Sequence, residues 1–311
     1  MEKSILATLV YFDIFDYPLT APEIWKWLYL EEAKNSLPTI GEILQILEDS
    51  DKIKSLVSSR RGFYFLKNRE GLVEIRESRY VLAFKKMKRA KRIANFLKFI
   101  PGIEMVALCN SLAWANAREE SDIDFFIVTA PNKIWTARFW SAGFLKIFGL
   151  RPNKKNNKDK ICLSFFTDED SLNLEPLAIS KADTYLIYWI TQLQPLFDRG
   201  GVYDKFWQAN AWIKKFLPNI FPRGVDEKEN TVFSAGTATA GLLEKFFRWF
   251  QIKMMPKNLR EMANCDSRVI ITDKILKFHA NDRREEYKKM WEEKIAKLFS
   301  PKADPSLAEN S

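Results

Sequence analysis

The segment Leu108–Val128, LCNSLAWANAREESDIDFFIV, constrains the fold more than any other part of this 311-residue chain. It joins two apolar runs, expected as strands at 104–108 and 122–128, through a polar connection. A helical pattern at 132–149 and a third strand-like run at 161–166 follow. Because strand and helix alternate here, the sequence predicts an α/β unit built on a mixed sheet.

Two aspartates open the second strand of this unit. Side chains alternate along a strand, so Asp122 and Asp124 are expected on the same face, about 6–7 Å apart. Ile123 and Phe125 then point into the core. Two carboxylates this close repel each other, and their oxygens suit hard divalent cations, Mg²⁺ above all. The pair therefore predicts a metal site.

A serine-bearing turn precedes the aspartates. Asn110 and Ser111 are expected to form this turn directly after the first strand. Its backbone N–H groups and the Ser111 hydroxyl offer a cradle for a triphosphate, as anion-binding turns do. The sequence thus predicts a cation and a triphosphate between the turn and the two carboxylates.

Together, these residues resemble the signature of the DNA polymerase beta-like nucleotidyltransferase superfamily. In that signature an apolar residue and Gly-Ser or Gly-Gly are followed, after about ten residues, by Asp-x-Asp among apolar residues. The matching residues of this chain are, in order, Leu108-Cys109, Asn110-Ser111 and, after ten more residues, Asp122-Ile123-Asp124. The resemblance covers roughly residues 90–170.

The resemblance implies a Mg²⁺-dependent nucleotidyltransferase, which moves a nucleoside monophosphate from a nucleoside triphosphate to an acceptor hydroxyl. Asp122 and Asp124 would hold two Mg²⁺ ions that bridge the triphosphate and position its α-phosphate for in-line attack. Ser111, with Asn110 beside it, would grip the triphosphate. The acceptor stays open between a small molecule, a protein side chain and an RNA end.

The chain departs from the family pattern at two positions. Asn110 replaces the family's glycine, and asparagine tolerates the left-handed backbone conformation better than most residues. The third carboxylate that the family often carries on the next core strand is absent from 160–166, where Ser164 takes the inward position and offers a hydroxyl ligand instead. A hydroxyl is a weaker ligand and a poor general base. A catalytically degenerate regulator that binds nucleotide or nucleic acid is therefore the alternative to an enzyme, and a scaffold for protein contacts is a third hypothesis.

Residues 1–68 are expected to form a winged-helix domain, because three helical patterns precede two strand-like runs at 53–57 and 63–66. Thr20 and Thr39 are expected to cap the second and third of these helices.

DNA is one candidate partner of this first domain. Arg60 and Arg61, between the two strands, would project toward phosphates. The outward positions of the third helix argue against DNA, since a phosphate backbone repels carboxylates. These positions are Glu42, Gln45, Glu48 and Asp49. Packing or protein contact is therefore favoured over DNA binding.

A long helix is expected over about 70–99, at the front of a nucleotidyltransferase-fold domain that spans 69–170. Between 79 and 98 it has eight basic residues and no acid, so nucleic acid is a candidate partner and a solvated face the alternative. The basic residues are Arg79, Lys85, Lys86, Lys88, Arg89, Lys91, Arg92 and Lys98. The apolar stripe expected to pack this helix consists of Tyr80, Phe84, Met87, Ala94 and Leu97.

The pattern beyond residue 170 is helical, so 171–300 is expected to form a helical C-terminal domain. Its helices are expected at 181–194, 202–216, 237–254 and 281–298. The tail at 301–311 is expected to be unstructured. The expected fold class is multi-domain α+β, with a winged helix, a central mixed sheet with helices, and a helical C-terminal region.

Composition limits the partners, the kinds of metal centre and the cellular location that the chain can have. A chain that is 47% hydrophobic, with a formal charge of +9, can bury a sizeable core and favours polyanionic partners. The single histidine, His279, excludes multi-histidine metal centres, and no nucleophile stands near it in the sequence. Cys109 and Cys162 lie in apolar runs and are expected as core residues in a reducing cytoplasm. A cytoplasmic protein without a membrane partner is expected, because no signal peptide opens the chain and no apolar run reaches roughly 18 residues.

Overall fold

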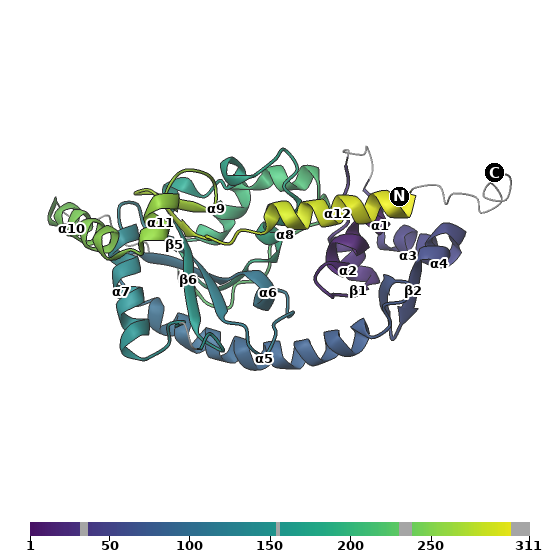
Figure 1. The fold of residues 1–311 in the computed structure, drawn as a ribbon, viewed down its shortest axis with the longest axis horizontal. Coiled ribbons are helices and arrows are strands. Elements are labelled where there is room, and N and C mark those ends of the chain that lie inside the picture. Colours follow the sequence, from purple (N-terminus) through teal and green to yellow (C-terminus); the bar gives the residue numbers. More distant parts are fainter. Residues whose placement is uncertain (32–36, 154–155, 230–237, 300–311) are drawn as a thin grey trace, which may run out of the picture.

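The computed structural model describes four stretches of the chain, residues 1–31, 37–153, 156–229 and 238–299. The tail that the sequence predicts to be unstructured lies outside them. The molecule is elongated, with the N-terminal helices at one end and a large sheet at the other (Figure 1). Helix α5 (Leu72–Leu97) runs beneath both parts and connects them.

The N-terminal part contains four helices and a small antiparallel sheet of strand order β1-β3-β2. Its elements are α1 (Glu2–Asp13), β1 (Leu19–Thr20), α2 (Ala21–Lys26), α3 (Ile40–Asp49), α4 (Asp51–Leu56), β2 (Val57–Arg60) and β3 (Phe63–Leu66). Both expected caps are confirmed, since Thr20 and Thr39 form capping boxes with Glu23 and Glu42. These boxes satisfy backbone N–H groups that the first helical turn leaves free.

One local prediction in this part is wrong. The run at 53–57 was expected as a strand, but it belongs mostly to helix α4, and β2 begins only at Val57. The physical reason is Ser50, whose hydroxyl accepts a hydrogen bond from the Ile53 backbone N–H at 3.2 Å and so starts a new helical turn directly after α3.

The central sheet has seven strands in the order β8-β7-β4-β5-β6-β10-β9. The strands are β4 (Ile103–Leu108), β5 (Ile123–Thr129), β6 (Ile161–Asp168), β7 (Gln194–Arg199), β8 (Lys228–Glu229), β9 (Val269–Ile271) and β10 (Ile275–Phe278). The pairs β5–β6 and β7–β8 are parallel and the other pairs are antiparallel, so the sheet is mixed, as expected.

The region after residue 170 is not purely helical, which corrects the sequence prediction. It contributes β7, β8, β9 and β10 to the same sheet as β4, β5 and β6. These strands are two to six residues long. Strands this short contain too few residues to show a clear alternation of apolar and polar side chains. Their pairing partners also lie far away in the sequence.

Helices cover both faces of this sheet (Figure 1). Helices α5 and α7 contact one face, and α9 lies against the other, where α8 also packs. The helices beyond α5 are α6 (Asn110–Ala113), α7 (Ile134–Ile147), α8 (Thr184–Gln192), α9 (Val202–Ala209), α10 (Ala238–Met254), α11 (Lys257–Met262) and α12 (Arg284–Phe299). Short 3-10 turns occupy 169–171, 175–177 and 211–215. None of the described helices is both long and apolar enough to cross a bilayer.

The apolar stripe expected along α5 is partly wrong. Tyr80 and Phe84 are 59% and 56% exposed, whereas Ala83, Ala90 and Ile93 are buried. The buried face also includes Arg76 and Lys86, two long side chains whose charges are satisfied inside the protein. A helix face with buried, paired cations looks polar in the sequence. The prediction therefore placed the buried face of α5 part of a helical turn away from its true position.

The N-terminal part and the sheet share one hydrophobic core. Hydrogen bonds also join the two parts: the Tyr17 hydroxyl donates to the Trp114 carbonyl at 2.9 Å, and the Tyr188 hydroxyl donates to the Trp27 carbonyl at 2.9 Å. Helix α12 returns along α1, where the Trp291 indole N–H donates to the Ala7 carbonyl at 2.9 Å. The N-terminal helices are therefore packed into the molecule and held in place.

Candidate metal and nucleotide site

The two aspartates of β5 converge with one side chain of the neighbouring strand. Asp122, Asp124 and Cys162 each offer a ligand atom, and these atoms all lie within 4.8 Å of one another. Strands β5 and β6 run parallel, and their register sets Cys162 directly beside Asp124. Ile123 and Phe125 are fully buried, as the alternation of side chains predicts. The carboxylates therefore share one face of the sheet.

Burial makes the charge of this pair costly. It raises the pKa of Asp124 to about 7, and the negative charge of Asp122 adds to this increase, although hydrogen bonds from the Asn110 and Cys162 side chains oppose it. Burial also raises the pKa of Asp122, against the lowering effect of its own backbone N–H and of Lys86. A bound cation would relieve both costs, because it neutralises the repulsion that desolvation strengthens.

Cys162 is the site residue that the sequence interpretation missed. It was expected as a core residue, but it is only partly buried and its sulfur faces the two carboxylates. Burial raises the pKa of its thiol, and the charges of Asp124 and Asp122 raise it further. The available signal was strand alternation, which sets residues 162 and 164 on the same face of β6.

Ser164, expected as a further metal ligand, has a different partner. It lies two residues beyond Cys162, and its hydroxyl is 3.0 Å from the Nε2 atom of His279. Burial lowers the pKa of His279 to about 4, and the charge of Lys277 adds to this effect, so the imidazole is neutral at neutral pH. No nucleophile stands near His279 in the sequence, and the fold brings the Ser164 hydroxyl to it from β6.

The turn after β4 has the backbone geometry that the family's glycine would supply. Asn110 has φ of 55°, in the left-handed region, as its residue type allows. The Trp189 indole N–H donates to the Asn110 side-chain oxygen at 2.9 Å. The Cys109 backbone N–H donates to the Asp124 carbonyl at 3.1 Å. The turn is thus fixed against the strand that bears the aspartates.

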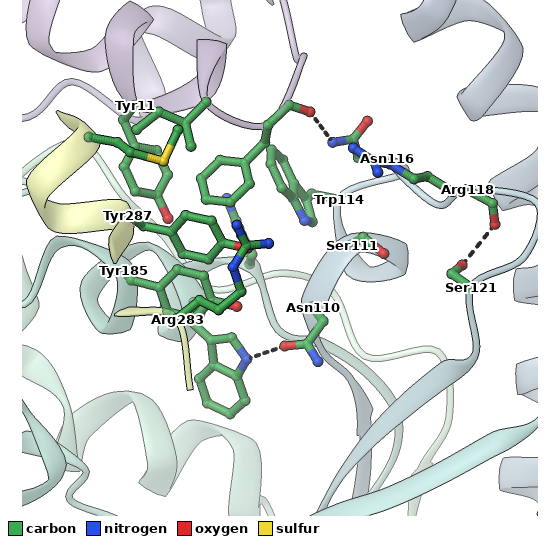
Figure 2. Close-up of a pocket in the computed structure, with 15 residues that line it drawn as sticks. Tyr11, Asn110, Ser111, Trp114, Asn116, Arg118, Ser121, Tyr185, Arg283 and Tyr287 are labelled. Atoms are coloured by element: carbon green, nitrogen blue, oxygen red, sulfur yellow. Dashed lines mark hydrogen bonds between the residues drawn. The ribbon is translucent and has the colours of Figure 1, made fainter. Parts of the chain in front are cut away.

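Ser111 lines a cavity of about 470 Å³ on one side of this turn. In Figure 2, Tyr11, Tyr185 and Tyr287 lie opposite Asn110 and Ser111 across this cavity. Two cations, Arg118 and Arg283, also line it. Such a cavity suits a ligand that combines a ring with an anionic group, because the aromatic side chains can stack on the ring and the arginines can pair with the anion.

A second cavity, of about 720 Å³, contains the carboxylates. Asp122, Asp124, Cys162, Ser164 and His279 all line it. The two cavities share a wall, which consists of Asn110, Tyr185, Trp189, Arg283 and Tyr287. Of these two cavities, Ser111 lines only the first and the carboxylates line only the second, so the side chains of this wall stand between the serine turn and the carboxylates.

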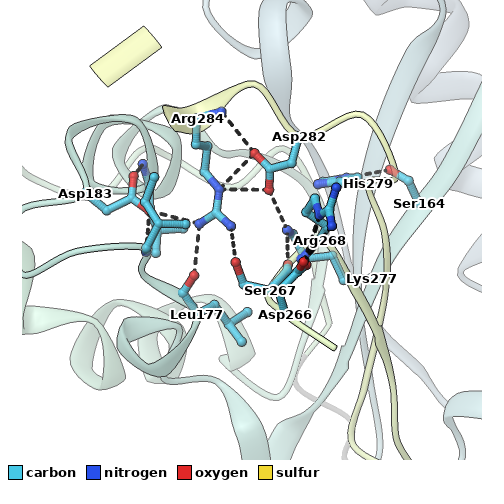
Figure 3. A network of polar contacts seen from close by, with 12 residues as sticks. Ser164, Leu177, Asp183, Asp266, Ser267, Arg268, Lys277, His279, Asp282 and Arg284 are labelled. Atoms are coloured by element: carbon cyan, nitrogen blue, oxygen red, sulfur yellow. Dashed lines mark hydrogen bonds and ion pairs between the residues drawn. The ribbon is translucent and has the colours of Figure 1, made fainter. Parts of the chain in front are cut away.

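An ion-pair network holds the far side of the second cavity (Figure 3). Arg284 pairs with Asp183 at 2.9 Å and with Asp282 at 2.9 Å, and Lys277 pairs with Asp282 at 3.1 Å. Arg284, Asp183 and Lys277 are buried. Because each of these buried charges has a partner, the network fixes the segment that presents His279.

Lys86 supports the approach to Asp122. Its ammonium group donates to the Glu119 and Ser121 carbonyls at 2.9 and 2.6 Å and pairs with Asp159 at 2.8 Å. It was expected as one of the basic residues facing a partner, but it is 3% exposed. Lys86 is therefore a positioning residue for the loop that leads into β5.

Other residues of the expected nucleic-acid surfaces also have partners within the chain. Arg60 pairs with Glu74, and Arg61 pairs with Glu77 at 3.0 Å. Arg79 donates to the Phe15 carbonyl at 3.1 Å. The outward positions of α3, which are Glu42, Gln45, Glu48 and Asp49, are exposed. These contacts reduce the positive charge that the N-terminal part and α5 present to solvent.

The chain was compared with known protein families, curated proteins and solved structures, and it matches none of them.

Proposed function

We propose that this protein is a divalent-metal-dependent nucleotidyltransferase, which transfers a nucleoside monophosphate from a nucleoside triphosphate to an acceptor hydroxyl. The observation that carries the proposal is the convergence of Asp122 and Asp124 beside the left-handed turn at Asn110-Ser111. The resemblance of the same residues to the polymerase-beta-like signature is a separate support.

The donor set fits a divalent cation. Asp122 and Asp124 would hold Mg²⁺ through carboxylate oxygens, whereas the nearby Cys162 thiol is a soft donor with a raised pKa and is not a ligand that Mg²⁺ prefers. Mg²⁺ in such sites takes one or two carboxylates together with substrate phosphates, so two ions are compatible with two aspartates. When bound, the metal supplies charge stabilisation for the phosphate oxygens.

The remaining roles belong to residues that line the two cavities. The Ser111 hydroxyl and the backbone of its turn would bind the triphosphate, and Arg118 and Arg283 would add positive charge. The acceptor would enter the second cavity, on the side of the carboxylates and Ser164. Acceptor identity stays open between a small molecule, a protein side chain and an RNA end.

Binding of a non-hydrolysable nucleoside triphosphate tests this proposal. With Mg²⁺ present, titration calorimetry should show binding to the native protein and a loss of at least tenfold in affinity for Asp122→Ala and for Asp124→Ala. Asp49→Ala removes an exposed carboxylate of α3 and is the matched control, which should bind like the native chain. Unchanged affinity in both site variants would rule out the metal-binding role.

Transfer is tested separately. Labelled nucleoside triphosphates, Mg²⁺ and a cell extract are incubated with the native protein or with Asp124→Ala, and the labelled product is identified. Label that depends on the native aspartates supports the enzyme. Nucleotide binding without transfer to any acceptor supports the alternative below.

A second candidate is a catalytically degenerate regulator that binds nucleotide or nucleic acid. It is favoured by β6, where Cys162 and Ser164 stand in place of a third carboxylate. The N-terminal part, expected as a winged helix, and the exposed cations of α5 would supply nucleic-acid contacts. A gel-shift titration across salt concentrations separates the candidates, because phosphate contacts weaken steeply with added salt.

A further inference from the structure

Helix α10 presents an unusual apolar face to solvent. Six large apolar side chains on this helix are between 37% and 71% exposed. We call them the α10 apolar face: Leu242, Leu243, Phe246, Trp249, Phe250 and Met254. They recur at intervals of three and four residues, so they form one continuous stripe along the helix. Isolated exposed apolar residues are ordinary, but a contiguous patch of this kind marks an interaction site.

The opposite face of α10 is anchored, so the stripe has a fixed direction. The Phe247 ring stacks on the Phe139 ring of α7 with centroids 4.3 Å apart. The Glu244 carboxylate accepts hydrogen bonds from the Trp135 and Thr136 backbone N–H groups at 2.6 and 3.0 Å. Helix α10 projects at the end of the molecule far from the N-terminal part, beside α7 (Figure 1).

The apolar region extends beyond α10 itself. Trp140 of α7 is 51% exposed, and its ring lies 6.3 Å from the Phe247 ring. Phe246 contacts the Trp249 and Phe250 rings at 6.2 and 6.4 Å. Phe246, Trp249 and Phe250 thus form a ring cluster within the α10 apolar face, and Trp140 adds an exposed indole beside the anchored Phe247. Tryptophan is the residue type that favours the boundary between water and lipid.

The charges around the α10 apolar face are positive. The helix contains Lys245, Arg248 and Lys253 and only one acid, Glu244, whose two oxygens are bound to the start of α7. Among the described residues no carboxylate pairs with Lys245 or Lys253, whereas Arg248 pairs with Asp273 at 2.9 Å. Lys253 follows Trp249 by four residues and therefore lies on the same face as the stripe, with its ammonium 5.1 Å from the centre of the Trp249 ring. Any surface that covers the stripe therefore meets this cation.

These positive charges distinguish between two candidate partners of the α10 apolar face, a second copy of the chain and a lipid surface. A second copy of the chain, related by a two-fold axis, would bring the same lysines together and repel itself. An anionic lipid surface matches both the apolar stripe and the lysines, because its interface takes up apolar side chains and its phosphates attract lysine. We propose that α10 docks this protein on anionic membranes, with the helix lying in the interface.

The proposal differs from the expectation of no membrane partner. That expectation rested on the lack of a spanning run, and a helix that lies in the interface needs none. The proposal is also independent of the proposed transferase activity, since it uses none of the residues at the carboxylates or at the serine turn.

Vesicle flotation with the full chain tests it. The chain should float with vesicles of phosphatidylcholine that contain about one-third phosphatidylglycerol, and it should stay unbound with pure phosphatidylcholine. The variant Phe246→Ser with Trp249→Ser should bind the anionic vesicles about tenfold more weakly or worse. The variant Lys245→Gln with Lys253→Gln should lose affinity and most of the salt dependence.

Matched controls replace exposed apolar residues elsewhere. Leu37→Ser with Phe221→Ser removes side chains that are 53% and 50% exposed, and it should bind like the native chain. All variants should melt within a few degrees of the native chain, because the replaced side chains are exposed. Failure of the native chain to bind anionic vesicles at low salt would overturn the proposal. So would light scattering that shows a native dimer and a monomeric Phe246→Ser, Trp249→Ser variant.

Discussion

At the scale of single residues, the folded chain disfavours the charged form of Asp124. Its pKa is raised from an ordinary 3.8 to about 7, so the folded state binds the proton more tightly than the unfolded state. The free energy of unfolding of the metal-free protein should therefore fall as pH rises from about 4 to about 7, and then level off. Stability falls in this range because, as pH rises, Asp124 loses its proton at a lower pH in the unfolded chain than in the folded chain.

Asp124→Asn tests this relation. At pH 8 the metal-free variant should be more stable than the native chain by about 1–2 kcal/mol, because it removes a repelled charge that is only partly shielded by solvent. At pH 4 the two proteins should be equally stable. Urea unfolding measures both. Added Mg²⁺ should stabilise the native chain at pH 8 and leave the variant unchanged, and stabilisation of both by Mg²⁺ would place the ion elsewhere.

The sequence predicted part of this site at the residue scale. Asp122, Asp124 and the turn follow from spacing and alternation alone. Cys162 and Lys86 were missed because their roles depend on strand register and on carbonyls from a distant loop. Strand alternation gives the face of β6 on which Cys162 lies but not its register against β5, and a lysine on an amphipathic helix looks solvated in the sequence whether or not it is buried.

At the scale of elements, the start of α6, directly after β4, gives a matched pair of variants. Asn110→Gly and Asn110→Ala both lose the hydrogen bond from the Trp189 indole N–H. Alanine must in addition adopt φ of 55°, which costs L-residues about 1–2 kcal/mol. Asn110→Gly should therefore be more stable than Asn110→Ala by about 1 kcal/mol in urea unfolding. Equal stability of the two variants would contradict a strained turn.

The elements themselves were predictable where the local pattern is strong. Strands β4, β5 and β6 are long apolar runs with buried backbones, and each was expected close to its place. Strands β8 and β9 have two and three residues and exist only because a partner strand lies beside them. The strand assignment at 53–57 failed because the Ser50 cap starts a helix there, and the stripe assignment on α5 failed because tertiary contacts bury Lys86.

At the scale of the whole molecule, the N-terminal part and the sheet should unfold together. Trp291 is 7% exposed and links α12 to α1, so Trp291→Ala should lower the free energy of unfolding by about 3–5 kcal/mol. Hydrogen exchange should show that α1 and β5 lose protection together in this variant. Trp249→Ala, at a position 57% exposed, is the control and should change stability by less than about 0.5 kcal/mol. Loss of protection in α1 alone would mean that the two parts are separate folding units.

The return of α12 along α1 also concerns synthesis of the protein on the ribosome. The Ala7 carbonyl receives its hydrogen bond from Trp291, and Tyr29 lies edge-on to the same indole with ring centroids 5.1 Å apart. Helix α1 therefore stays without part of its cover until Trp291, 284 residues after Ala7, has been translated. Contacts of such long sequence separation form late and slowly. A nascent chain of this protein should therefore hold its leading helices in an incomplete state, open to chaperones, until α12 emerges.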